Sequence, residues 1–279
     1  SVEPMGRGNL NDTYVVLLET GREKRKTVLQ KINRRVFPHP EHIMANMLKV
    51  TEHVRKKVRS ENGSNGGKWR FPVLLKEREG ECFFRDQDGE YWRMMTFVDS
   101  ARSFEEVQNA KHATEVATVL SCFHRLISDI DPDTLYDTLP GFHITPWYLK
   151  QYDAVAASGG AKDRVRAPEI DHLKRFVEDR RRFAGVLEGA AAKGKLVARP
   201  IHGDPKVDNV MMDETSNEGV AIVDLDTVKP GLVHYDFGDA VRSVCNPAGE
   251  NAKNLDEIVF DMNLFKAFFE GYMAHGAEF

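Results

Sequence analysis

The chain has 279 residues, of which 41% are hydrophobic and 29% are charged, and its formal net charge is −4. This composition is typical of an ordinary globular protein that is long enough to bury a large core. The small negative charge and the lack of a dense basic stripe argue against nucleic acid as a partner. No stretch approaches the ~18 apolar residues of a membrane span, so we expect no membrane insertion either.

The cysteines point to a reducing compartment. Cys82, Cys122 and Cys245 are far apart in the sequence and form no CxxC pair. Such usage argues against a disulfide framework and against a zinc site. The first ten residues lack the apolar run of a signal peptide. We therefore expect a cytoplasmic protein, whose oligomeric state the sequence leaves open.

The first hundred residues predict a small sheet with one helix. Strand-like runs occupy residues 14–18, 27–32, 71–76, 81–86 and 90–98. Between the second and third runs, residues 40–62 carry apolar side chains at helical spacing, with Pro40 near the first turn. These apolar positions are Ile43, Met47, Val50, Val54 and Val58. The order predicts an antiparallel sheet with one helix packed against it.

After Ser100 the pattern is mainly helical. Ser103 is the predicted N-cap of a helix that continues to about Ile127. Helical spacing recurs in residues 145–157, 168–190 and 254–274, and one β-rich region separates the last two of these stretches. The sequence therefore predicts an α+β protein of two lobes, residues 1–98 and 99–279, with a ligand cleft between them.

The β-rich region carries a concentration of polar groups. Its first part, IHGDPKVDN (201–209), precedes a short apolar run, and a turn separates that run from a second one that ends at Asp224. Two such runs predict a hairpin, which would bring Asp204, Asn209 and Asp224 together at one end. Carboxylate and amide oxygens are the ligands that Mg²⁺ prefers, and Lys206 adds a cation at the same place.

The spacing of Asp204, Lys206 and Asn209 resembles the catalytic loop of the kinase-like phosphotransferases. The opening His-Gly-Asp is similar to the branch of aminoglycoside phosphotransferases and choline kinases. Four further segments, NLNDTYVV, VLQKIN, GFHITP and VHYDFGDAVRS, are similar to segments of bacterial N-acetylhexosamine 1-kinases. The resemblance covers most of the chain and implies a bilobal protein-kinase-like fold. It also implies that related sugar kinases continue well beyond the position of Phe279.

The resemblance implies ATP- and Mg²⁺-dependent transfer of the γ-phosphate to a small-molecule acceptor, with the anomeric hydroxyl of an N-acetylhexosamine as the leading choice. Asp204 would accept the proton of the attacking hydroxyl, Lys206 would lie near the γ-phosphate, and Asn209 and Asp224 would hold Mg²⁺. Arg242 would contact the acceptor. The implied nucleotide-binding residues are Asn11, Thr13, Lys31, Thr96, Phe97 and Val98.

Three aspartates at the end of the predicted hairpin or after it, Asp224, Asp226 and Asp236, are candidates for contact with the metal. Asp236 begins a DFG tripeptide, which holds the metal in protein kinases, but Asp224 lies closer to the protein-kinase separation from Asn209 and ends an apolar strand. We therefore assign the metal to Asp224. For Asp236 the resemblance implies a bracing role, in which it accepts backbone hydrogen bonds from the loop as the matching aspartate does in related phosphotransferases. Asp226 is a candidate for a second aspartate contact to the metal, in addition to Asp224.

Other points stay open. Protein kinases pair the strand lysine with a helix glutamate, but here no glutamate lies between Glu41 and Glu52, and Asn46 occupies the middle of that interval. Either Glu41 or Glu52 takes this role, or the lysine is held differently. Gly6 and Gly8 are candidates for a phosphate-covering loop. An aminoglycoside, a choline-like amine or an amino alcohol is an alternative acceptor. An inactive nucleotide-binding module is a second alternative function.

Overall fold

A computed structural model describes residues 1–5, 10–21, 23–62, 68–158 and 168–276. The proposed loop glycines Gly6 and Gly8 lie outside these ranges. The chain forms two compact units, one of Ser1–Thr138 with Arg199–Phe279 and the other of Leu139–Ala198. This partition differs from the predicted division after residue 98, which stays a prediction.

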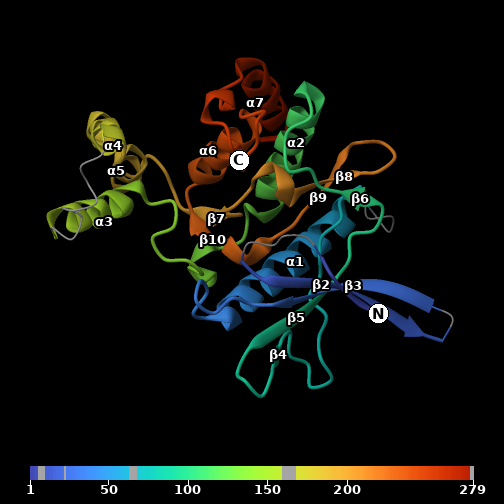
Figure 1. Ribbon diagram of the computed structural model, residues 1–279. Helices are drawn as coiled ribbons and strands as arrows, with labels where there is room; N and C mark the ends of the chain where they lie inside the picture. The colour runs from blue at the N-terminus through green and yellow to red at the C-terminus, as the bar shows by residue number, and fades with distance from the viewer. Residues whose placement is uncertain (6–9, 22, 63–67, 159–167, 277–279) are drawn as a thin grey trace. The chain divides into compact units, whose positions relative to one another are not determined.

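The first unit begins with a five-stranded antiparallel sheet in the order β1-β2-β3-β5-β4 (Figure 1). Its strands are β1 (Val2–Pro4), β2 (Asp12–Thr20), β3 (Glu23–Lys31), β4 (Phe84–Arg85) and β5 (Tyr91–Thr96). The predicted strands at 14–18, 27–32 and 90–98 are confirmed. The predicted strand at 71–76 is wrong, because this segment makes only one bridge, from Leu74 to Met95. Pro72 has no backbone N–H for a regular ladder.

Helix α1 (Pro40–Asn62) matches its prediction. All five residues of its predicted apolar stripe are at most 6% exposed, and such burial contributes about 1.5–3 kcal/mol for each side chain. Asn46 lies in the N-terminal half of the helix and is buried. Its Nδ2 donates to the carbonyls of Tyr136 and Val228, both at 2.8 Å, and its Oδ1 accepts from the N–H of Tyr136 at 2.9 Å. The residue in the place of a helix glutamate therefore anchors the helix instead.

Helix α2 (Ala110–Ile127) packs against α7 (Met262–Gly276), as Figure 1 shows. The prediction that Ser103 caps this helix was wrong. Asn109 is the N-cap, and its side chain accepts a hydrogen bond of 2.9 Å from the N–H of His112. Asn109 stands directly before the apolar periodic run, which is the place where a side-chain cap is most useful. None of the helices in the described ranges has the length and apolar character needed to cross a bilayer.

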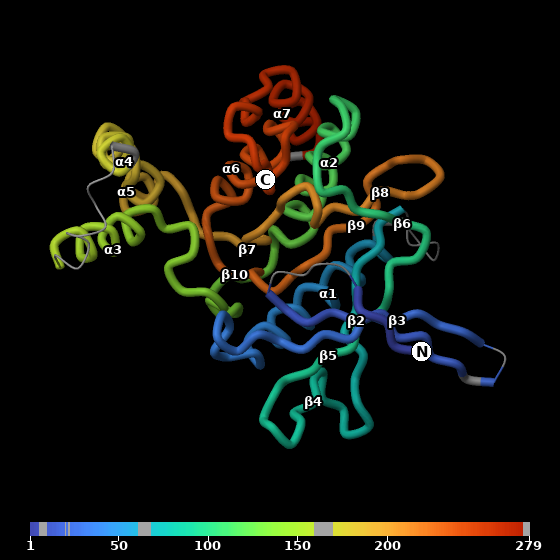
Figure 2. Tube along the Cα trace, in the orientation of Figure 1, coloured from blue at the N-terminus to red at the C-terminus, as the bar shows by residue number. Residues whose placement is uncertain are grey.

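The predicted hairpin is present. It consists of β8 (Val210–Asp213) and β9 (Gly219–Ile222), with β6 (Ala101–Arg102) on the other side of β8, and Figure 2 traces these three segments running together. The short helices η4 (Val207–Asn209) and η5 (Leu225–Thr227) lie at the open end of the hairpin. There the N–H of Val223 donates to the carbonyl of Asn209 at 2.9 Å. The segments that carry Asn209 and Asp224 are therefore neighbours.

Three further elements complete the first unit near the site. Strand β7 (Arg199–Ile201) precedes the hairpin in the sequence and β10 (Lys229–Gly231) follows it, and the two strands pair with each other. Helix α6 (Val233–Val244) contains the DFGDAVRS segment. Short 3₁₀ helices are η2 (Pro132–Thr134) and η6 (Leu255–Glu257).

The second unit consists of α3 (Thr145–Ala157), α4 (Pro168–Arg180), η3 (Arg181–Phe183) and α5 (Val186–Ala192). Helices predicted at 145–157 and 168–190 are confirmed, with η3 interrupting the second. Arg181 connects the helices through ion pairs to Asp153 at 2.8 Å and to Glu178 at 2.6 Å. The antiparallel sheet and α1 come first in the chain, and the other helices of both units follow. This arrangement is the predicted α+β class.

Candidate active site

A cavity of about 200 Å³ lies between the sheet and the open end of the hairpin. Four predicted nucleotide-binding residues line it, namely Thr13, Thr96, Phe97 and Val98. The predicted metal ligand Asp224 lines it as well, together with Met47 of α1 and Met211 of β8. An apolar cavity with a few polar groups at one end is typical of a small-molecule site.

The structure does not bring Lys31 into this cavity. Successive side chains of a strand point to opposite faces, and in β3 the cavity-lining residues are Val28 and Gln30. Lys31 is one residue out of phase with them, and its Nζ lies 3.9 Å from Oδ2 of Asp12. A one-residue difference in phase is enough to move a side chain to the other face of a sheet.

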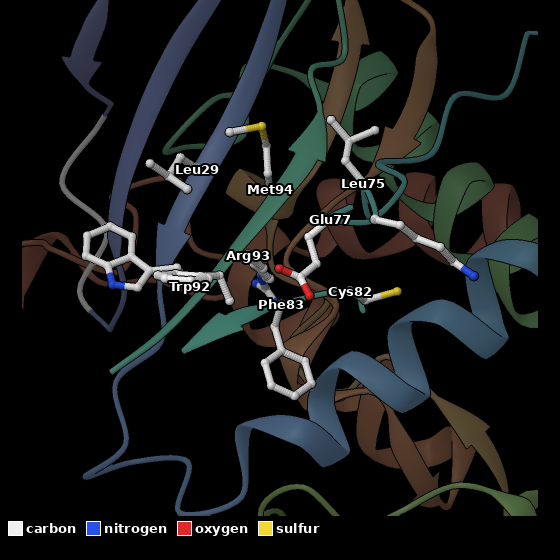
Figure 3. Close-up of a pocket in the computed structure, with 10 residues that line it drawn as sticks. Leu29, Leu75, Glu77, Cys82, Phe83, Trp92, Arg93 and Met94 are labelled. Atoms are coloured by element: carbon white, nitrogen blue, oxygen red, sulfur yellow. The ribbon is translucent and has the colours of Figure 1, made fainter. Parts of the chain in front are cut away.

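A second cavity, of about 520 Å³, lies on the opposite face of the sheet. Figure 3 shows Leu29, Trp92 and Met94 of the sheet facing Leu75 and Phe83 there. Its lining is mostly apolar, and none of the predicted catalytic or metal-binding residues is part of it. The cavity beside Asp224 is therefore the candidate active site, although it is the smaller one.

The cation that the sheet contributes to the site is Arg93 of β5, which the sequence analysis missed. Its side chain is 1% exposed and forms an ion pair with Asp226. Its Nε and Nη2 also donate to Oε1 of Gln30, at 3.0 Å and 2.7 Å. Gln30 in turn donates to Oγ1 of Thr13 at 3.0 Å. A continuous hydrogen-bonded chain therefore connects the predicted nucleotide residue Thr13 with the segment after β9.

Asn11, another predicted nucleotide-binding residue, is buried in the same network. Its Nδ2 donates to Oδ2 of Asp226 at 2.7 Å, and its Oδ1 accepts from the N–H of Asn33 at 3.0 Å. One carboxylate oxygen of Asp226 thus accepts a hydrogen bond from Arg93, and the other accepts one from Asn11. This arrangement does not support Asp226 as the second metal contact that the sequence left open.

Asp204, Lys206 and Asn209 lie together in the loop before β8. The Nδ2 of Asn209 donates to the carbonyl of Asp204 at 2.8 Å and to its Oδ2 at 3.2 Å. The Nζ of Lys206 lies 3.8 Å from Oδ2 of Asp204 and 3.4 Å from Oδ2 of Asp208. Burial raises the pKa of Asp204 to about 6, although Lys206 opposes the shift. A carboxylate with a raised pKa is a stronger proton acceptor.

Asp224 has a left-handed backbone, with a φ of 61°. Such a conformation is uncommon for residues other than glycine and is found most often at functional sites. Although its side chain is open to the cavity, the surrounding protein displaces bulk water and raises its pKa, and the Asp226 carboxylate raises it further. The Asp204 carboxylate contributes to this shift, so the two predicted site residues interact.

The oxygen atoms at this end of the hairpin are suitable ligands for a magnesium ion. The amide nitrogen of Asn209 faces Asp204, so its amide oxygen points away from that residue. Asp224 supplies a carboxylate from the neighbouring segment. Both are hard oxygen ligands, and the mutual repulsion of the carboxylates around Asp224 is what a bound cation would relieve.

Two buried side chains hold the catalytic loop in place. His202 is fully buried, its Nε2 donates to the carbonyl of Val223 at 3.0 Å, and its Nδ1 accepts from the N–H of Asp204 at 3.2 Å. Asp236 accepts from the N–H groups of His202 at 2.6 Å and Gly203 at 2.8 Å, and pairs with Nε2 of His124 at 2.7 Å. The predicted bracing role of Asp236 is confirmed.

Gly203 is required by the same arrangement. Its φ is +88°, and a Cβ at this position would lie 2.5 Å from the carbonyl oxygen of Thr227. Only glycine adopts this backbone without strain and without that clash. The loop can therefore turn sharply between the buried His202 and Asp204, the predicted proton acceptor.

Replacing Asp236 with asparagine is expected to lower the free energy of unfolding by about 3 kcal/mol at pH 7, because buried donors lose their charged acceptor. Hydrogen bonds hold the pKa of Asp236 below 3.8 in the folded state. Its charge therefore stabilises the fold above pH 3.8, and this contribution is lost as the pH falls through the lowered pKa. Urea unfolding at several pH values measures both effects. The exposed Asp179→Asn serves as a control, and equal stability of Asp236→Asn and wild type at pH 7 would refute the bracing role.

Arg242 lies on the exposed side of the site, in α6. It pairs with Asp239 at 2.8 Å and with Glu250 at 2.6 Å. Both of these carboxylates also raise the pKa of Asp204, so Arg242 and its partners belong to the surroundings of Asp204. Asp239 and Glu250 were not predicted; the three-residue spacing of Asp239 and Arg242 on a helix is the signal that could have revealed the first of them.

The chain is similar to a known protein family and to several solved structures. A model described as the phosphotransferase enzyme family matches residues 1–257. A similar solved structure is an aminoglycoside phosphotransferase from Alicyclobacillus acidocaldarius, with 15% identity, a TM-score of 0.62, and coverage of 98% of this chain and 73% of that chain. A microcompartment-associated aminopropanol kinase has 16% identity, a TM-score of 0.53, and coverage of 99% and 75%. A choline kinase from Cryptosporidium parvum has 15% identity, a TM-score of 0.53, and coverage of 100% and 74%.

These structural neighbours share the kinase-like fold that the sequence predicted. The family match spans most of the chain and includes the cavity, the catalytic loop and the β8–β9 hairpin. The chain therefore belongs to the phosphotransferase enzyme family.

Proposed function

We propose that the protein transfers the γ-phosphate of ATP, with Mg²⁺, to a hydroxyl group of a small molecule. The observation that carries this proposal is the meeting of Asp204, Asn209 and Asp224 at the open end of one hairpin, beside a cavity lined by Thr96, Phe97 and Val98. In this proposal residues 1–98 supply most of the nucleotide side of the site, and residues 99–279 supply the catalytic side. We place the protein in the cytoplasm.

Phosphoryl transfer needs alignment and neutralisation of charge more than covalent help from the protein. Asp204 would orient the attacking hydroxyl and accept its proton as the transfer completes. Its hydrogen bond from Asn209 fixes the carboxylate in position. Lys206, which is near Asp204, would lie by the transferred phosphate.

Magnesium would neutralise charge on the ATP phosphates when bound. Asn209 and Asp224 would hold it through one amide oxygen and one carboxylate. Thr13 would approach the phosphates from the sheet, and Asn11 would act through Asp226. The apolar side chains around Phe97 would accept the base.

The leading acceptor is an N-acetylated hexosamine, phosphorylated at its anomeric oxygen. The similarity of residues 9–16 and 233–243 to the sugar kinases supports this choice. Arg242 is more than half exposed and lies beside Asp204's neighbour Asp239, so it is available to contact an acceptor.

One observation favours a second candidate, an amine-bearing acceptor such as an aminoglycoside, a choline-like amine or an amino alcohol. The surroundings of Asp204 are acidic: its neighbours Asp208, Asp239 and Glu250 outnumber the cations Lys206 and Arg242. Excess negative charge in a site attracts a cationic ligand. The aminopropanol kinase and choline kinase among the structural neighbours are named for such acceptors.

An acceptor panel tests the proposal. The protein is incubated with ATP, Mg²⁺ and single acceptors, namely N-acetylglucosamine, N-acetylgalactosamine, choline, ethanolamine and an aminoglycoside, and ADP release is followed with Asp204→Asn in parallel. Turnover with the N-acetylhexosamines alone supports the leading acceptor, and turnover with the amines alone supports the second. Nucleotide binding without turnover on any acceptor would instead support an inactive nucleotide-binding module.

A further inference from the structure

A buried ion pair lies directly behind the metal end of the site. The side chains of Arg93 and Asp226 are 1% and 3% exposed. The guanidinium bonds to both Asp226 and Gln30, and the other carboxylate oxygen accepts from Asn11. Every oxygen of the Asp226 carboxylate is therefore occupied by a donor that comes from the sheet or from its edge.

The pair also fixes the backbone that carries the proposed metal ligand. Asp226 follows Asp224 by two residues, and its carbonyl accepts from Oγ1 of Thr138 at 2.9 Å. Asp224 itself has a φ of 61°, a conformation that persists only when its surroundings impose it. The contacts of Asp226 with Arg93 and Asn11 tie this strained segment to the sheet.

Arg93 and Gln30 are well placed to transmit the constraint. They are directly paired in the β3–β5 ladder, and both line the active-site cavity. The Nη1 of Arg93 also lies 3.8 Å from Sδ of Met47 in α1. The guanidinium thus contacts the sheet, helix α1 and the segment after β9 at once, which a lysine ammonium with its single nitrogen does less well.

We propose that Arg93 is a positioning residue for the metal site. By holding the carboxylate of Asp226, together with Asn11, it sets the orientation of Asp224 toward the cavity. The buried cation of the sheet, Arg93, therefore binds the protein's own Asp226. The sequence had instead predicted that a lysine of the sheet, Lys31, would bind the nucleotide. The inference rests on the proposed function, because it assumes that Asp224 holds the metal.

The test measures Mn²⁺ affinity by electron paramagnetic resonance in the presence of a non-hydrolysable ATP analogue, so that it needs no acceptor and no turnover. Arg93→Met and Asp226→Asn are each expected to weaken Mn²⁺ binding by about 10- to 100-fold, which is typical for loss of a group that orients a metal ligand. The double variant is expected to lose no more than either single variant, because both changes remove one shared contact.

Two further variants make the test decisive. Arg70→Met removes another arginine–aspartate pair, with Asp213 at 2.8 Å, at the far end of β8, and is expected to leave Mn²⁺ affinity unchanged. Arg93→Lys keeps the charge but cannot hold Gln30 and Asp226 together, so it carries the test if Arg93→Met fails to fold, with an expected loss of a few-fold to tenfold.

Unchanged Mn²⁺ affinity in Arg93→Lys and in the folded Arg93→Met would overturn the positioning role, and so would additive losses in the double variant. A wild-type protein that binds no Mn²⁺ with the nucleotide analogue would be a failure of the proposed function itself. The two failures are therefore distinguishable.

Discussion

Replacing Asp204 with asparagine is expected to lower kcat by about 100- to 10,000-fold, the range that loss of a general base produces. Asparagine has nearly the same shape and can still hydrogen-bond to Asn209, so the loop should keep its structure. It cannot accept a proton from the acceptor hydroxyl. The loss should therefore fall on kcat, and the half-saturating concentration of ATP should change little.

Steady-state ADP release at saturating ATP and acceptor measures this effect, and thermal unfolding of the same preparation verifies that the variant is folded. Lys206, which lies 3.8 Å from the Asp204 carboxylate, is unchanged in this variant. A folded Asp204→Asn with kcat within threefold of wild type would remove Asp204 from the reaction.

Replacing Asp224 with asparagine is expected to lower kcat/KM by about 100- to 1,000-fold, the size of comparable electrostatic deletions. The half-saturating concentration of Mg²⁺ should rise at least tenfold in the same variant, because one anionic ligand is lost. Asparagine is the best replacement here, since it tolerates the left-handed backbone that Asp224 adopts with its φ of 61°. The effect can therefore be assigned to the missing charge and not to the backbone.

Activity as a function of Mg²⁺ concentration measures this second effect. Asp256→Asn, which removes an exposed carboxylate from η6, is the matched control and should follow the wild-type curve. If Asp224→Asn kept the wild-type dependence on Mg²⁺, the assignment of the metal to this residue would be refuted.

Local pattern was enough to predict the elements whose burial is periodic. The apolar stripe of α1 is buried as expected, from Ile43 to Val58, because a helix that packs on one side must place its apolar residues three and four apart. The β8–β9 hairpin is equally visible, because a polar turn separates two short apolar runs. From it followed the proximity of Asn209 and the segment of Asp224, whereas the bracing role of Asp236 came from the resemblance to related phosphotransferases.

The predictions that failed concern side chains whose contacts come from segments far apart in the sequence. The stretch TVLQKI alternates in a way that leaves either Gln30 or Lys31 to face the cavity, and only the packing of the sheet decides between them. Arg93 is an extreme case. A buried arginine is stable only with all its donors satisfied, and its partners Gln30, Met47 and Asp226 come from three other segments.

Boundaries were also misjudged where two signals competed. Ser103 precedes acidic residues and resembles a helix start, but Asn109 stands next to the periodic run and forms the cap. The DFGDAVRS segment contains a glycine and still lies inside α6. There Asp236 occupies the first turn, where a negative charge is favoured by the helix dipole, and its contacts with the catalytic loop stabilise the arrangement.

The most direct test of the site is a crystal structure with Mn²⁺ and a non-hydrolysable ATP analogue, in which anomalous scattering locates the ion. The account predicts an anomalous peak in contact with the amide oxygen of Asn209 and the carboxylate of Asp224, with Asp204 facing the terminal phosphate and Asp226 still held by Arg93. A peak coordinated by Asp236, or nucleotide bound with its phosphates far from Asp224, would contradict it.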